Sequence, residues 1–374
     1  MFLVDTARPH VAEHLHDIAE WGELWDITGW STERVCRRAV ELAPAGVVTF
    51  SEFQQRLTAA IAHACGLVGH RPDTVELLVD KYAQRAALAA GGVQATRCVL
   101  IRAGDDPPSE PYPAVLKPRH GAGSVDTCQV DSPAAAAEAL AAFDAGRDFV
   151  LEELLVGDPS AAGPDWGDYV SVESVVRGGV AATVSVTGKL PLIEPFRETG
   201  HLLPPTISEG LAYEVVRLEQ AALKALGVTD GITHTEIKFT ADGPRIIEVN
   251  GRMGGLINDV VARAYGYDLT RAGIQVALGR PADEPCRVAR TVAYQRFVMA
   301  PRHVNEVRTT APLEAIGDLS GVVRVDLHAR PGDRVDWRAG LTGWLAVVYG
   351  EAPDHATMRS RVAEIDTLAA AAYP

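Results

Sequence analysis

The stretch GITHTEIKFTADGPRIIEVNGRMGG (residues 231–255) predicts a β-hairpin, and its turn determines which side chains face each other. If residues 241–243 form a three-residue loop with Gly243 in the left-handed conformation, the register places Glu236 directly opposite Glu248. Like charges opposite one another repel, so this pair is unfavourable unless a cation lies between the carboxylates. The hairpin therefore predicts a divalent-cation site. The alternative, which would be preferred for this segment alone, is an amphipathic hairpin with a solvated acidic face.

The same register brings further polar residues to this face of the hairpin. His234 would lie opposite Asn250, Lys238 would share the face, and Arg252 would follow two positions after Asn250. Oxygen and nitrogen ligands beside a lysine and an arginine are suited to a cation that carries a phosphate. This face of the hairpin is thus predicted to bind a cation and a phosphate.

The composition excludes several kinds of partner. The 374-residue chain has a net charge of −14 and an isoelectric point near 5.3, so no basic surface is expected for a nucleic acid or an anionic membrane. No run approaches the roughly 18 apolar residues of a membrane span, and the first residues run into Asp5 instead of a signal-peptide core. The five cysteines are widely spaced without a CxxC pair, which indicates reduced thiols. We expect a cytoplasmic protein that acts on small molecules.

Helical and strand patterns alternate along the chain and indicate an α/β (α+β) fold. Capping residues, periodic apolar residues and terminating glycines predict helices at 31–43, 51–66, 80–91, 131–146, 208–226 and 257–278, and from Asp354 onward. Short apolar or alternating runs predict strands at 2–5, 22–28, 46–50, 98–101, 114–118, 149–155, 169–176, 180–188, 291–299 and 344–350. The first three runs predict a small N-terminal α/β unit.

A strand that delivers Lys117 leads into a glycine-rich segment. In AVLKPRHGAGS (residues 114–124), amides freed by glycine can point at phosphate oxygens while the lysine neutralises them, which suits a nucleoside triphosphate. The segment matches neither a Walker A loop nor a GxGxxG turn. A snorkelling surface lysine is the alternative. FVLEELL (149–155) is compatible with an adenine pocket or with solvated acids at a strand end.

Together these motifs resemble the ATP-grasp superfamily. Between about Gly46 and Gly279, the matching segments follow the family's order: DKYAQR with Lys81, LKP with Lys117, EELL (152–155), YVSVES (169–174), Glu236 and EVNGR (248–252). FRETGHLLP (196–204) and NGRMGG (250–255) are similar to carboxylate–amine ligases that include the L-amino acid ligases. The resemblance implies a short N-terminal α/β domain (1–75), a linker helix and nucleotide lid (76–155), a core with the metal and substrate site (156–285) and a C-terminal α/β cap (286–374).

The resemblance also implies which residues bind ATP and metal. The nucleotide ligands would be Lys81, Lys117, Gly121, Gly123, Ser124, Glu152, Glu153, Leu155, Asp168 and Lys238. The lysines and loop amides would hold phosphates, the residues at the strand end would flank adenine, and Asp168 would bind ribose. Two Mg²⁺ ions, with Mn²⁺ as the alternative ion, would be bound by Glu236, Glu248 and Asn250 and would offset charge as the terminal phosphoryl group moves.

A second set of residues is implied to bind the substrates. Glu198 and His201 match the family's amino acid pocket, where an acid and an imidazole meet the amine end of the substrate, and Arg252 would stabilise an acyl phosphate. Gly254 and Gly255 precede a predicted helix and could offer amides to a carboxylate. A loop histidine and a tight turn are the alternative interpretations. The expected reaction is ATP-dependent amide formation between a small carboxylic acid and an amine, through an acyl phosphate.

Two other functions are compatible with the same motifs. A carboxylating or purine-pathway ATP-grasp ligase would use bicarbonate or phosphoribosylamine, and the motif at Glu198 makes this less favourable. A noncatalytic ATP-binding scaffold would have lost a metal carboxylate or a lysine, and none is lost. The family also implies a homodimer as a weak expectation, and the identity of the acid and the amine is not readable from the sequence.

Overall fold

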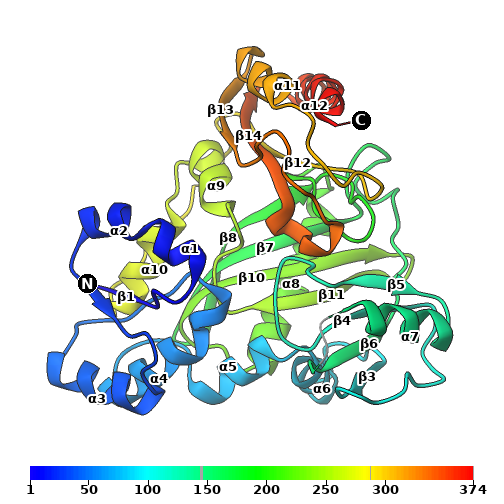
Figure 1. The fold of residues 1–374 in the computed structure, drawn as a ribbon. Helices are drawn as coiled ribbons and strands as arrows, with labels where there is room; N and C mark the ends of the chain where they lie inside the picture. Colours follow the sequence, from blue (N-terminus) through cyan, green and yellow to red (C-terminus); the bar gives the residue numbers. More distant parts are fainter. Residues whose placement is uncertain (144–145, 287, 374) are drawn as a thin grey trace.

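The strands in the described residues form one two-stranded, one four-stranded and one eight-stranded sheet. The computed structural model describes residues 1–143, 146–286 and 288–373 (Figure 1). Within these ranges, no helix combines the length and the hydropathy that a membrane span needs.

The N-terminal region is a small α/β unit with two strands, where the sequence predicts three. β1 (Phe2–Val4) pairs in parallel with β2 (Leu24–Asp26). The helices around this pair are α1 (Pro9–Glu13), α2 (Leu15–Trp21) and α3 (Thr32–Leu42). The predicted strand at 46–50 is wrong. This segment has no hydrogen-bonded partner strand in the described residues, and Phe50 instead packs against Gly273 of a later helix.

Three helices then lead from the N-terminal unit to the lid. They are α4 (Gln55–Cys65), which follows a 3₁₀ turn at Glu52–Gln54, α5 (Pro72–Val79) and α6 (Lys81–Ala90). The sequence analysis did not predict α5, although Pro72 at its first position is a helix-start signal. α6 is capped by Asp80, whose side chain accepts from the amides of Tyr82 and Ala83. This cap places Lys81 at the first turn of α6.

The four-stranded sheet is antiparallel and corresponds to the predicted nucleotide lid. Its order is β3 (Cys98–Ile101), β6 (Phe149–Glu153), β4 (Ala114–Pro118) and β5 (Cys128–Val130). α7 (Pro133–Ala142) packs on it, with Ser132 as the predicted cap and Pro133 at its first position. The predicted range of this helix extended to 146; residues 144 and 145 lie outside the described residues.

The eight-stranded sheet is the central element of the fold. Its order is β11 (Gly243–Asn250), β10 (Gly231–Thr240), β7 (Tyr169–Arg177), β8 (Val180–Lys189), β9 (Gly200–Leu203), β12 (Val292–Met299), β14 (Trp344–Ala352) and β13 (Val322–Leu327). The last three strands belong to the predicted C-terminal cap (286–374). They continue the core sheet, because β9 pairs with β8 on one side and with β12 on the other.

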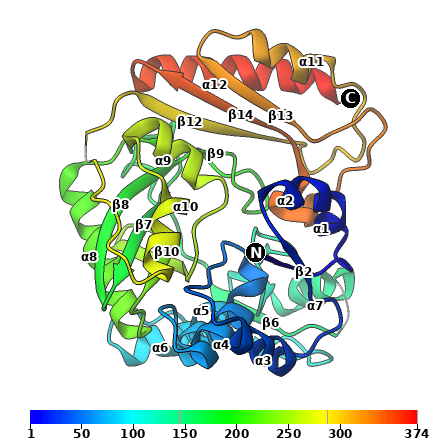
Figure 2. The same ribbon diagram turned by 90° about the vertical axis from the view of Figure 1, so that its left-hand side faces the viewer.

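Helices cover both faces of this sheet. Apolar residues of α5, α6 and α8 (Glu209–Ala225) pack against β7, β10 and β11. Another cluster joins α9 (Ile257–Tyr265) and α10 (Leu269–Ala277) to β7, β8, β9 and β12. At the C-terminal end, α12 (His355–Ala369) lies along β12 and β14, as Figure 2 shows. The short elements of this end are α11 (Ala311–Glu314) and 3₁₀ turns at Ala315–Asp318, Trp337–Gly343 and Ala370–Ala372.

The predicted helix at 257–278 is two helices, which corrects the sequence analysis. Gly266 adopts a left-handed φ of +68° and ends α9, and Asp268 caps α10 by accepting from the amide of Arg271. The periodicity of apolar residues continues across this break because both helices pack on the same sheet face.

Candidate functional site

The hairpin of β10 and β11 pairs Glu236 with Glu248 and His234 with Asn250, as the sequence predicts. Both glutamates line a cavity of about 490 Å³ between the lid sheet and the eight-stranded sheet. The two acids therefore lie on the same side of their sheet and face one cavity.

The turn that produces this register differs from the predicted one. Thr240 pairs with Gly243, where a three-residue loop would pair it with Pro244, although Gly243 does have a positive φ of +99°. The ladder then shifts by one residue after Ile237, so that Ile247 has no partner. This bulge is essential to the site, because a one-residue slip would otherwise turn Glu248 to the opposite face.

Buried partners surround the two facing acids. Nζ of Lys81 lies 3.0 Å from Oε1 of Glu248, and Nε2 of His234 lies 3.3 Å from Oε1 of Glu236. Nδ1 of His234 is 2.9 Å from Oε1 of the fully buried Glu173. Burial opposes a charged imidazole, but Glu173 raises the pKa of His234 to about 9. Against the effect of burial, the hydrogen bond from His234 lowers the pKa of Glu236, so this acid is ionised at neutral pH.

On the lid side, the cavity wall contains a buried cluster around Glu152. Arg85 donates to both carboxylate oxygens at 3.0 and 2.9 Å, and Nζ of Lys117 lies 2.8 Å from Oε2. Burial favours the neutral acid, yet these two cations lower the pKa of Glu152 to about 2. The sequence analysis placed Glu152 beside adenine and missed Arg85, which lies one helical turn after Lys81 on α6.

The glycine-rich loop, residues 119–127, contributes one wall of the cavity. Gly121, Gly123 and Ser124 all line the cavity and have positive φ angles of +134°, +69° and +56°. Nζ of Lys81 donates to the carbonyl of Gly121 at 2.6 Å, so α6 and the loop are in direct contact. The predicted phosphate ligands therefore converge from three separate segments of the chain.

The predicted adenine residues line the cavity, whereas the predicted ribose residue, Asp168, does not. Glu153 and Leu155 line it, and so does Lys238. Asp168 is not among the lining residues; its Oδ1 accepts from Nζ of Lys238 at 2.6 Å. Glu153 pairs with Arg97 at 3.0 Å. Asp168 thus contributes to the cavity by holding Lys238.

The predicted substrate residues form a second buried cluster. Oε1 of Glu198 accepts from Nζ of Lys189 at 2.8 Å, and Oε2 lies 3.6 Å from Nε2 of His201. Lys189 is only 1% exposed. Burial alone would raise the pKa of Glu198. Lys189 and His201 outweigh this effect and hold the pKa well below its usual range. Burial and Lys189 together lower the pKa of His201. Glu198 is therefore an anion and His201 is neutral at pH 7.

The tautomer of His201 follows from its neighbours. Nε2 of Gln295 donates to the carbonyl of Leu256 at 2.9 Å, so Oε1 of Gln295 is the acceptor for Nδ1 of His201 at 3.0 Å. Nε2 of His201 then carries a lone pair, and it is buried without a hydrogen-bond partner among the described residues. A ligand that donates hydrogen bonds could satisfy this nitrogen.

Arg252 closes the site on the side of the N-terminal unit. Its Nε donates to Oε2 of Glu52 at 2.8 Å, and an Nη2 donates to Oδ1 of Asn250 at 3.3 Å. Nδ2 of Asn250 donates to the carbonyl of His234, so this predicted metal ligand is buried and does not line the large cavity. Glu52, in the 3₁₀ turn before α4, was not predicted. Burial raises its pKa in spite of Arg252.

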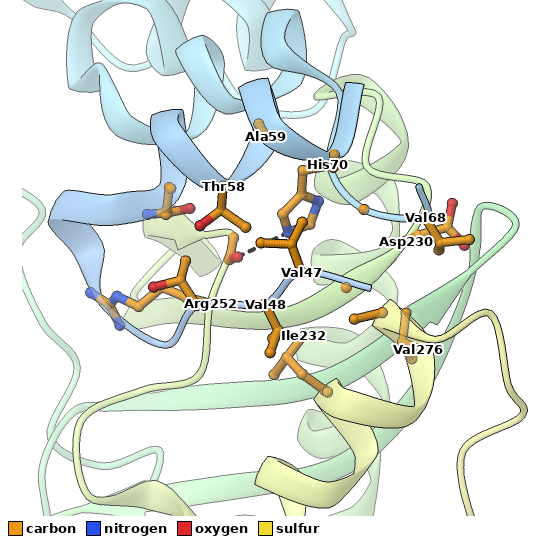
Figure 3. A pocket seen from close by; sticks show the side chains of 18 of the residues that line it. Val47, Val48, Thr58, Ala59, Val68, His70, Asp230, Ile232, Arg252 and Val276 are labelled. Carbon is orange, nitrogen blue, oxygen red and sulfur yellow. Dashed lines mark hydrogen bonds between the residues drawn. The ribbon is translucent and has the colours of Figure 1, made fainter. Parts of the chain in front are cut away.

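Arg252 also lines a second, small cavity of about 60 Å³, whose lining side chains are drawn in Figure 3. Its walls come from residues 47–50, α4, α10 and the start of β10. His70 reaches the carbonyl of Gly251 at 2.9 Å and fixes the backbone that precedes Arg252. Gly254 packs directly on the ring of His234, whereas Gly255 lines the large cavity and has open space around it. Of the two predicted glycines, Gly255 is the one with room for a ligand beside its backbone.

The donors present fit a magnesium ion. Among the described residues, no group of three or more His, Cys, Asp or Glu forms a complete metal cage. Mg²⁺ is usually held by one or two carboxylates together with phosphate oxygens and water. Glu236 and Glu248 supply this number of carboxylates on one cavity face.

Comparison with known proteins identifies similar sequences and solved structures with a similar fold. No family model matches the chain. Carnosine synthase 1 of Homo sapiens is 30% identical over 234 residues, 58% of this chain and 27% of that protein, so the chain spans about a quarter of its length. Alanine–anticapsin ligase of Bacillus subtilis is 25% identical over 351 residues, 81% of this chain and 73% of that protein.

A solved L-amino acid ligase from Bacillus licheniformis matches with a TM-score of 0.74 and 22% identity, over 90% of this chain and 84% of that one. The chain has the ATP-grasp fold that the order of its motifs predicts.

Proposed function

We propose that this ATP-grasp protein, a relative of the ligases named above, is an ATP-dependent carboxylate–amine ligase that forms an amide and releases ADP and phosphate. The observation that carries the proposal is one cavity lined by Glu236, Glu248, Lys81, Lys117 and His201. Facing acids, two lysines and a separate buried acid and base in one cavity are suited to phosphoryl transfer onto a bound acid.

Different residues that line the cavity would bind the phosphates, the adenine and the metal ion. Lys81, Lys117 and the amides of the glycine-rich loop would bind the ATP phosphates, and the backbone near Leu155 would meet adenine. Glu236 and Glu248 would hold Mg²⁺, with Asn250 as a further ligand; Mn²⁺ suits the same oxygen donors. The ion would offset the negative charge of the phosphates during transfer.

An amino acid is the carboxylic acid that this site fits best. Its ammonium group would donate to the Glu198 carboxylate and to the lone pair on Nε2 of His201. Lys189 keeps Glu198 ionised for this purpose. Arg252 would bind the substrate carboxylate and then the acyl phosphate, while Glu52 orients its guanidinium.

The reaction follows from this placement. A carboxylate oxygen of the acid attacks the γ-phosphorus of ATP, and the bond to the β,γ-bridging oxygen breaks to release ADP. The neutral amine attacks the acyl carbon, the bond from that carbon to the phosphate oxygen breaks, and the nitrogen loses a proton. Holding both reactants in one closed cavity supplies orientation and keeps water from the acyl phosphate.

The two alternative functions are less well supported. A carboxylating or purine-pathway enzyme would have no use for a buried acid with an unpartnered imidazole nitrogen at its substrate end. A noncatalytic scaffold would not need to retain the bulge that turns Glu248 toward Glu236.

The test is a screen of purified protein with MgATP against pairs of amino acids, with ADP and phosphate measured and the product identified by mass. We expect ADP release that requires both an acid and an amine, and a product lighter than the two substrates by one water. Turnover with bicarbonate or phosphoribosylamine would favour the first alternative. Equal ADP release without an amine would indicate a kinase or ATPase. Glu248→Gln should abolish turnover and leave the thermal unfolding midpoint close to that of the wild type.

A further inference from the structure

A segment near the C-terminus holds the glycine-rich loop in place. The amide of Leu341 donates to the carbonyl of Gly123 at 2.8 Å, and the amide of Asp126 donates to the carbonyl of Arg338 at 3.2 Å. These two backbone hydrogen bonds join residues about 215 positions apart in the chain. The loop that contributes one wall of the cavity is thus tied to the far end of the sequence.

Gly340 allows this contact to form. Its φ of +55° and ψ of −132° belong to a conformation that L-residues rarely adopt. A Cβ at this position would lie 2.1 Å from the carbonyl oxygen of Gly123 and 2.7 Å from the amide nitrogen of Val125. Both the backbone conformation and the lack of a side chain are therefore required for the two segments to approach.

The neighbouring residues extend the contact on both sides. Trp337 packs against the apolar core of the lid sheet, and the guanidinium carbons of Arg302 and Arg338 lie 4.6 and 5.0 Å from its ring centre. A cavity of about 640 Å³ separates α7 from residues 192–196 beside it. Trp337 and Arg338 line this cavity, so α7 is not packed directly on residues 192–196 beside the contact.

The same segment also reaches the proposed substrate residues. Leu341 and Trp344 line the catalytic cavity. Trp344 stacks on Phe297 with ring centres 5.5 Å apart, and Phe297 meets the ring of His201 edge to face at 4.9 Å. Leu341 packs against the same apolar cluster as Phe297 and Trp344. Contacts therefore run from His201 through this cluster to Leu341 and Gly123.

We propose that residues 337–341 are a latch that holds the glycine-rich loop closed over the nucleotide, with Gly340 as a positioning residue for that loop. The inference rests on the proposed function, since a closed loop would protect an acyl phosphate from water. Binding of the acid beside His201 would support the latch through Phe297 and Trp344. Release of ADP would require the two backbone hydrogen bonds to break.

The main test is Gly340→Ala, with Gly343→Ala as the matched control. A Cβ at Gly343 has its nearest neighbour at 3.6 Å, an ordinary contact, and its φ is not in the left-handed region. For Gly340→Ala we expect about a tenfold rise in KM for ATP, as for the loss of one to two hydrogen bonds. We also expect more ADP released per amide formed, because water reaches the intermediate. Gly343→Ala should match the wild type in both.

Hydrogen exchange of the wild-type protein tests the latch without any turnover. The amides of Leu341 and Asp126 should exchange more slowly when MgADP or a non-hydrolysable MgATP analogue is added, and the same change should be absent in Gly340→Ala. If Gly340→Ala does not fold, Leu341→Ala removes the side chain that lies against Gly123 and should raise the exchange rate at Asp126.

The outcomes separate the latch from the reaction. Unchanged exchange at both amides with nucleotide, or normal coupling in a folded Gly340→Ala variant, would overturn the latch. Failure of every acid and amine pair to release ADP, with a nucleotide-dependent exchange response still present, would reject the proposed function and keep the latch.

Discussion

The two largely buried carboxylates that line the large cavity, Glu152 and Glu198, differ in how completely they are paired. Each accepts a hydrogen bond from a lysine, Lys117 or Lys189. Glu152 has in addition a bidentate Arg85, whose guanidinium also donates to the backbone of β11. Glu198 has a neutral imidazole 3.6 Å away with an unused lone pair.

This difference indicates that the two carboxylates have different roles. A carboxylate whose oxygens are all occupied by fixed donors cross-links its surroundings, and Glu152 joins α6, the lid sheet and β11 in this way. A buried carboxylate with an incomplete set of donors can accept another one from a ligand. We therefore expect Glu152 to act mainly on stability and Glu198 mainly on substrate binding.

Glu152→Gln is expected to have the largest effect. It leaves Arg85 and Lys117 buried without their anion, so the free energy of unfolding should fall by about 3–5 kcal/mol. Urea unfolding monitored by circular dichroism would measure this, with exposed Glu138→Gln on the lid helix as the control. A loss below 1 kcal/mol would remove the distinction between the two clusters.

The ion pairs of Glu152 should also make the stability of the protein depend on pH. The folded pKa of Glu152 is about 2, below the ordinary value of 4.5, so its contribution is complete above pH 4.5 and is lost as the pH falls toward 2. The gap between the two values corresponds to about 3 kcal/mol. Unfolding measured at pH 5, 4 and 3 should give a steeper loss for the wild type than for Glu152→Gln. Parallel curves would contradict the assignment.

Glu198→Gln should lower the free energy of unfolding by less than Glu152→Gln does, because it leaves one buried cation, Lys189, without its anion instead of two. Its main effect should be on the kinetics. The amide can no longer neutralise a substrate ammonium, so kcat/KM for the amino acid that is activated should fall about 100-fold, or about 2.7 kcal/mol. KM for ATP should change little. A variant that loses ATP affinity to the same degree would show that this cluster does not bind the acid. Glu198→Asp should recover part of the activity.

The smallest expected effect is a change in the alkylation rate of Cys98, whose thiol lies beside Glu152. Burial and then the charge of Glu152 raise the pKa of Cys98 to about 12, whereas Cys286 is exposed. Iodoacetamide at pH 8 should label Cys286 quickly and Cys98 slowly, as read by peptide mass. Cys98 should react faster in Glu152→Gln than in the wild type. Equal rates at the two cysteines of the wild type would show that the cluster does not shield its thiol.

The sequence was informative where local signals suffice. Ser31, Ser132 and Asp354 each cap the helix that they predict, because a cap depends on residues within one turn. The pairing of Glu236 with Glu248 also follows from a short hairpin. The break at Gly266 was missed because apolar periodicity is continuous across it.

Other features depend on distant parts of the chain and could not be predicted. The bulge at Ile247 compensates for a two-residue turn, and nothing in the local sequence distinguishes this from a three-residue loop without a bulge. Residues 46–50 have a strand composition but no partner strand. Arg85 and Glu152 are 67 residues apart, and their contact exists only once the lid sheet lies on α6.

The placement of β9 limits how this protein can be shortened. A gene fragment that ends near residue 279 would include all the ATP-grasp motifs and would look like a natural minimal enzyme. It would also strip β12 from β9 and leave the backbone amides and carbonyls of Gly200–Leu203 unpaired along one side. Such a fragment would expose an unpaired strand edge that includes His201, a proposed substrate residue, so we expect it to self-associate through this edge.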